Sequence, residues 1–124
     1  MKKIFFLLIA FIGFSVASMA QAGTFTVSKH NFGKIKQNVP ATYTFNFKNN
    51  NAKPIVIETA TADCGCTSPT YPKEPIMKGQ QNKIIVTYNA ANMGKFTKKV
   101  HVKFANVDAP IELTIEGEVV ASKK

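Results

Sequence analysis

The chain has 124 residues, with 16 basic side chains against 7 acidic ones and a formal net charge of +9. None of the basic residues is arginine, the side chain best suited to two-point recognition of phosphate and guanine, and the lysines are scattered along the chain. Length and composition therefore indicate one domain with a basic surface and argue against specific nucleic-acid binding.

The N-terminal segment indicates export from the cytoplasm. Lys2 and Lys3 precede an apolar run over residues 4–16, and small residues follow at the spacing that signal peptidase requires. The apolar run is short for a transmembrane span, which needs about 20 residues. We therefore predict a signal peptide over residues 1–22, and a mature domain over residues 23–124 with no membrane span, in the periplasm or secreted. Removing the two lysines lowers the net charge by two.

The first part of the mature chain predicts strands. Residues 24–28 form a candidate strand with Phe25 and Val27 on one face. Gly33 then marks a turn or bulge. Residues 42–47 alternate aromatic residues with threonine and asparagine, which is typical of a half-buried strand. The asparagine-rich stretch 49–54 predicts a turn, because asparagine tolerates a left-handed backbone and proline ends strand pairing.

A strand over residues 55–62 is predicted next, and it leads directly into the two cysteines. Prolines then interrupt about 20 residues before the next clear strand, a length that is usually functional or conceals a short edge strand. We expect Ile76 and Met77 to form that edge strand, and Tyr71 to anchor the loop.

Three further strands are predicted over residues 83–89, 96–104 and 111–119. The last two alternate apolar with charged residues and suggest a hairpin. A turn centred between residues 107 and 108 would place Lys103 opposite Glu112, His101 opposite Thr114, Lys99 opposite Glu116, Val102 opposite Leu113 and Val100 opposite Ile115. Opposite charges across an antiparallel pair contribute roughly 0.2–1 kcal/mol each, which favours this register.

The mature sequence lacks a helical period and contains six or seven short strands separated by polar turns. This pattern predicts an all-β fold, namely an immunoglobulin-like β-sandwich of about seven strands. A small β-barrel is the alternative.

The segment Asp63-Cys64-Gly65-Cys66-Thr67 contains the only two cysteines of the chain and is the candidate functional site. An oxidising compartment permits a disulfide between them, and Gly65 provides the backbone freedom that such a small ring needs. Four interpretations remain open: a structural pair, a redox dithiol, a soft-metal site for Cu(I) or Zn(II), and a bond to another chain.

Other candidate side chains do not complete a site in the sequence. Met77, Met93 and His101 are conceivable additional metal ligands, but nothing in the sequence brings them near the cysteines. His30 and His101 are the only histidines, and we expect both to be surface residues. We predict no catalytic residues and no cofactor.

An ordered series of motifs resembles the exported bacterial family known as domain of unknown function 1573, over about residues 25–119. The series comprises Phe32-Gly33-Lys34-Ile35, residues 43–49, Cys64-Gly65-Cys66-Thr67, Pro69, Gly79 and Gly94-Lys95-Phe96. The resemblance implies an immunoglobulin-like sandwich related to the domains of major sperm protein and of hydin-like proteins, which are mostly binding or scaffolding modules.

Together these features predict a non-enzymatic, exported module that binds or assembles in the bacterial envelope. An exposed edge strand would let it pair with a protein partner. The alternative function is thiol-redox or copper handling by Cys64 and Cys66.

Overall fold

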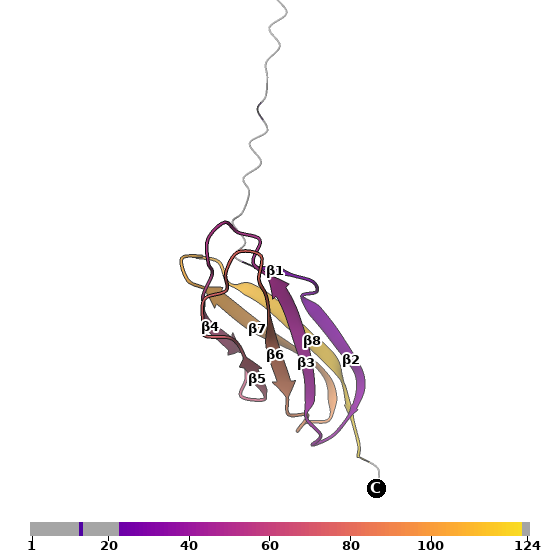
Figure 1. Cartoon of the computed structure of the whole chain (residues 1–124). Coiled ribbons are helices and arrows are strands. Elements are labelled where there is room, and N and C mark those ends of the chain that lie inside the picture. The colour runs from indigo at the N-terminus through magenta and orange to yellow at the C-terminus, as the bar shows by residue number, and fades with distance from the viewer. Residues whose placement is uncertain (1–12, 14–22, 123–124) are drawn as a thin grey trace, which may run out of the picture.

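The computed structural model describes Gly13 and residues 23–122, which form two four-stranded sheets packed face to face (Figure 1). The predicted signal peptide lies outside the described residues except for Gly13. One sheet, here called sheet A, has the order β1 (Thr24–Phe25), β3 (Ala41–Lys48), β6 (Gln81–Tyr88), β5 (Thr67–Thr70). Sheet B has the order β2 (Lys29–Lys36), β8 (Ile111–Val120), β7 (Gly94–Phe104), β4 (Ile57–Ala62).

This architecture is the predicted immunoglobulin-like β-sandwich. The described part of the chain contains no helix that is long and apolar enough to cross a membrane.

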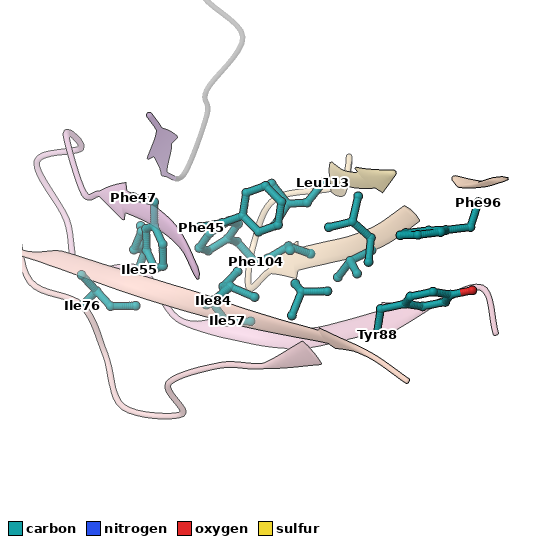
Figure 2. Close-up of a cluster of buried hydrophobic side chains, with 14 of the residues drawn as sticks. Phe45, Phe47, Ile55, Ile57, Ile76, Ile84, Tyr88, Phe96, Phe104 and Leu113 are labelled. Carbon is teal, nitrogen blue, oxygen red and sulfur yellow. The ribbon is translucent and has the colours of Figure 1, made fainter. Parts of the chain in front are cut away.

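The core lies between the sheets and follows the alternation seen in the sequence. Phe45 and Phe47 of β3 are buried, while the threonines and Asn46 between them face outward or toward the rim. Figure 2 shows these rings meeting Phe104 and Leu113 of sheet B, with Tyr88 stacked on Phe96 at one end. Strands β3, β6, β7 and β8 thus each contribute an apolar face to a shared interior, which removes apolar surface from water.

The chain changes sheets just after β1. Thr26 donates its N–H to the Asn46 carbonyl in sheet A (3.1 Å), whereas the Ser28 carbonyl accepts from Thr114 in sheet B (2.8 Å). The predicted strand over residues 24–28 is therefore too long, and Val27 is 41% exposed instead of facing the core. The sequence alternation gave no sign that the backbone turns away at this point.

Gly33 forms the predicted bulge, within a strand whose partner was not predicted. β2 pairs in parallel with β8, and the register shifts between Asn31 and Lys34. Gly33 has a positive φ of 69°, which glycine adopts without steric cost, and its N–H donates to the Asn31 side chain at 2.7 Å.

The predicted hairpin of β7 and β8 is present, but its predicted register is wrong by two residues. Val100 lies opposite Leu113 and His101 lies opposite Glu112. A shift of two keeps every side chain on its predicted face, so hydrophobic pattern cannot distinguish the two registers. Lys99 reaches Glu112 diagonally at 3.1 Å, so the observed register also brings a lysine of β7 to a glutamate of β8.

The outer face of sheet B carries most of the ion pairs. The predicted pairing of Lys103 with Glu112 is replaced by a contact with Glu58 on the neighbouring strand β4, at 3.4 Å. Lys29 of β2 contacts Glu116 of β8 at 3.4 Å. Cross-strand ion pairs therefore join all four strands of sheet B and not only the predicted hairpin.

The predicted edge strand at Ile76 and Met77 is wrong. The edge of sheet A is β5, while Ile76 forms one isolated bridge with Ile55, with N–H···O distances of 2.8 and 2.9 Å. The sequence Thr-Ser-Pro-Thr reads as a turn because proline weakens a strand, although proline is compatible with an edge position. Tyr71 packs against the core, as predicted.

Candidate functional site

The cysteine motif forms the corner at which the chain crosses from sheet B to sheet A. β4 ends at Ala62 and β5 begins at Thr67, so residues 63–66 connect two edge strands of opposite sheets. The carbonyl of Cys66 accepts a hydrogen bond from Asn89 at 2.9 Å, which ties the corner to the end of β6. The Asp63 N–H donates to the Lys99 carbonyl at 3.4 Å and holds the other side.

Cys64 and Cys66 form a disulfide within this corner, with their Cα atoms 5.3 Å apart. The described chain has no free cysteine, so neither sulfur is available as a thiolate ligand or for a bond to another chain in this oxidised form. Both cysteine residues are half-buried and Gly65 is exposed, with open space where a side chain would stand.

Thr67 connects the disulfide to the buried part of the molecule. The residue is only 4% exposed, and its hydroxyl lies 3.8 Å from Sγ of Cys64 and 3.7 Å from Sγ of Cys66. Sulfur in a disulfide is a weak acceptor, so these are weak partners for a buried hydroxyl. Thr67 belongs to the sequence motif, but the sequence does not indicate a role for its hydroxyl.

His101 lies beside the motif, which the sequence did not predict. β4 pairs with β7 so that Thr61 lies opposite His101. Two residues further along the chain, Asp63 Oδ1 lies 3.0 Å from His101 Nε2. This contact is partly exposed, and His101 stays on the charged face as predicted. Only the pairing of β4 with β7, far apart in the sequence, could have revealed it.

The other proposed ligands are not gathered at the motif. Met77 follows Ile76, which pairs with Ile55 near the opposite end of β4 from the cysteines. Met93 is exposed in the β6–β7 connection. Within residues 23–122, no three His, Cys, Asp or Glu side chains lie together in a way that could hold a metal ion.

His30 differs from the expected surface histidine. Its ring stacks on Tyr43 with centroids 3.7 Å apart, and its edge meets Phe32 at 4.7 Å. The residue is half-buried, and its ring extends from β2 to contact Tyr43 of β3. His30 therefore contributes to closing the side of the sandwich.

A second candidate site is the open edge of β3. The Asn46 carbonyl accepts from Thr26, so it points away from β6, and Thr44 and Thr42 point their backbone groups the same way. β1 pairs only with the last two residues of β3, Phe47 and Lys48. Among the described residues, the remaining edge has no neighbouring strand in sheet A (Figure 1).

The other sheet edges carry features that hinder strand addition. β5 contains Pro69, and β2 and β4 are each interrupted by a register shift. Between Thr42 and Phe45 the β3 edge has no proline, charge or register shift. Natural sheets use such features to block unwanted pairing, so their absence at this edge distinguishes it from the others.

Solved structures confirm the class of fold. The ASH/PapD-like domain 7 of human CEP192 has a TM-score of 0.72 at 6% identity, covering 90% of this chain and 97% of that one. A protein of unknown function from Porphyromonas gingivalis W83 has a TM-score of 0.66 at 12% identity, over 86% of this chain and 51% of that one. At these identities the likeness defines an immunoglobulin-like sandwich and nothing further.

The chain spans only part of some similar proteins. It corresponds to about half of the Porphyromonas gingivalis chain. It also matches 31% of the Vibrio cholerae VesB protease, with a TM-score of 0.62 at 12% identity over 79% of this chain. The same sandwich thus occurs as one part of larger proteins.

The family follows from the sequence match. A family model described as a protein of unknown function, DUF1573, matches residues 23–119. The chain therefore belongs to this family, and the resemblance inferred from the ordered motifs is confirmed. No curated protein matches the sequence.

Proposed function

We propose that this chain is a non-enzymatic module exported to the bacterial envelope, where it binds a partner polypeptide by strand addition at the open edge of β3. The observation that carries the proposal is the edge of β3 at Thr42 and Thr44, whose backbone groups point away from β6 and have no paired strand in sheet A among the described residues. Unpaired backbone groups on a strand edge can bind an extended peptide through main-chain hydrogen bonds.

The surroundings of the edge define the partner's chemistry. The outer face of sheet A beside it is polar, with the hydroxyls of Thr42 and Thr87 3.2 Å apart. The rim on the inner side holds Tyr43 and His30, both half-buried. A strand with alternating apolar and uncharged polar residues would match these two faces, because successive side chains of a strand point to opposite sides.

Export rests on the N-terminal sequence, whose charged start, apolar run and small residues are typical of a signal peptide. The non-enzymatic interpretation is supported by the way charged side chains are used. Lysines and glutamates on sheet B pair across strands, as Lys99 does with Glu112. Such exposed pairs contribute little to stability and organise the surface.

The test is a proline substitution that alters only the open edge. Thr44→Pro removes a backbone N–H that points away from β6, so the β3–β6 ladder stays intact. Thr44→Val is the matched control because it retains the N–H and the branched shape. We expect Thr44→Val to capture the same envelope proteins as the wild type and Thr44→Pro to capture none.

Hydrogen exchange of the Thr42 and Thr44 amides provides a second measurement. Both should exchange rapidly in the isolated protein and slowly once a captured partner is bound. Equal capture by folded Thr44→Pro and wild-type protein would refute binding at this edge.

A further inference from the structure

We infer that the Cys64–Cys66 disulfide exchanges with cysteine pairs of other polypeptides, oxidising them, and that the Thr67 hydroxyl stabilises the thiolate released in this reaction. This activity is independent of strand addition at β3, which lies on the opposite edge of sheet A. Three features of the corner support it: access to the disulfide, the position of Thr67, and backbone contacts that do not depend on the disulfide.

Access is provided by Gly65. Gly65 is exposed and both cysteines are half-buried, and a side chain built at Gly65 would meet no atom within 4 Å other than those of its two neighbours. The corner also lies where two edge strands meet, with no further strand outside it among the residues described. An approaching thiolate can therefore reach a disulfide sulfur, which exchange requires.

Thr67 is placed to favour the reduced state. Its buried hydroxyl lies 3.8 Å from the Cys64 sulfur and 3.7 Å from the Cys66 sulfur. Disulfide sulfurs accept hydrogen bonds weakly, whereas a thiolate is a charged and much stronger acceptor. Because the hydroxyl is almost equidistant from both sulfurs, it can stabilise whichever one leaves as the thiolate.

The exchange takes place in two steps. A thiolate of the partner attacks one sulfur, the Cys64–Cys66 bond breaks, and a mixed disulfide forms while the other cysteine leaves as a thiolate. The partner's second thiol, as its thiolate, then attacks the mixed disulfide. The partner ends as a disulfide, Cys64 and Cys66 end as thiols, and two electrons and two protons pass from the partner to this chain.

Backbone contacts hold the corner independently of the sulfur–sulfur bond. Asn89 donates to the Cys66 carbonyl at 2.9 Å, and Thr67 donates its N–H to the Cys64 carbonyl at 3.4 Å. On the other side of the corner, the Asp63 carboxylate is engaged by His101 at 3.0 Å. These contacts should keep the two cysteines near each other after reduction.

The test uses the purified oxidised protein and two reductants, dithiothreitol and a synthetic peptide carrying two reduced cysteines. Alkylation followed by mass spectrometry counts free thiols over time, and the peptide's own disulfide is measured in the same samples. We expect one peptide disulfide for each pair of thiols formed in the protein. Thr67→Val should slow the exchange roughly tenfold, because a hydrogen bond to a charged group is lost.

Two control variants separate this role from a structural one. Thr67→Ser keeps the hydroxyl and should restore a rate near that of the wild type. Thr70→Val changes an exposed threonine of the same strand and should leave the rate unchanged. Circular dichroism and thermal unfolding confirm that each variant is folded.

Two results would overturn the inference. One is a disulfide that stays intact in excess dithiothreitol and leaves the peptide reduced. The other is an equal exchange rate for folded Thr67→Val, Thr67→Ser and wild-type protein.

Discussion

At the scale of single residues, Asn49 shows how one buried amide joins two loops. Its side chain is fully buried and donates to the carbonyls of Lys53 and Ile76, each at 2.9 Å, while its Oδ1 accepts from Asn51 at 2.9 Å. The sequence predicted a turn here because asparagine tolerates a left-handed backbone. The turn is confirmed, but the positive φ values fall elsewhere, and Asn49 acts through its side chain.

Asn49→Ala should therefore destabilise the fold. The substitution removes the hydrogen bonds that the buried amide donates to the Lys53 and Ile76 carbonyls, although the Ile76 carbonyl keeps its bond from the Ile55 N–H, and we expect a cost of roughly 1–3 kcal/mol. Urea unfolding should give a lower midpoint with an unchanged slope. Asn50→Ala is the control, since Asn50 is exposed and its side chain donates to the Thr24 hydroxyl at the surface; equal losses for both variants would contradict this role.

At the scale of elements, the bulge of β2 fits over a glycine of β8. A Cβ on Gly117 would stand 2.8 Å from the Gly33 carbonyl and 3.0 Å from the Phe96 ring. Backbone cannot move aside as the end of a flexible side chain can. The parallel pairing of β2 with β8 thus depends on two glycines, one that bends the bulge and one that leaves room for it.

Gly117→Ala should cost roughly 1–3 kcal/mol, the range for overpacking a filled interior. Gly65→Ala is the matched control, because that position is open and should change stability by less than about 0.5 kcal/mol. Thermal unfolding of both variants measures the difference. A Gly117→Ala protein as stable as the wild type would mean that β2 can shift without loss.

At the scale of the whole molecule, both sheets depend on one core. The Phe47 ring lies 6.0 Å from that of Phe104, joining β3 of sheet A to β7 of sheet B. The two outer faces differ: sheet B carries the cross-strand ion pairs, and sheet A beside the open edge carries mainly threonine and other uncharged polar groups. A shared core leads us to expect that the two sheets unfold together.

Phe45→Ala should destabilise both sheets together by roughly 3–5 kcal/mol, because it removes a fully buried ring and leaves a cavity. Val39→Ala is the control, since Val39 is 51% exposed and should change little. Far-ultraviolet circular dichroism and hydrogen exchange in β7 should report one shared transition. Loss of protection in sheet A alone would show that the sheets unfold separately.

Much of the fold could be predicted because strand alternation is local. The faces of β3, β7 and β8 follow from which residues alternate, and the bulge follows from Gly33. The register of β7 with β8 could not be predicted, because a two-residue shift preserves the faces. β5 could not be recognised, because its pairing depends on the preceding corner and not on strand-forming residues.

The sequence by itself determined the family, the β-sandwich class and the disulfide-capable pair Cys64 and Cys66, since each depends on residue types and short spacings. Only the tertiary structure decided what surrounds that pair and which edge stays open. Thr67 meets the sulfurs, and His101 meets Asp63, because strands far apart in the chain pair side by side. The β3 edge is open because the chain leaves sheet A after β1, a change of direction that local alternation does not encode.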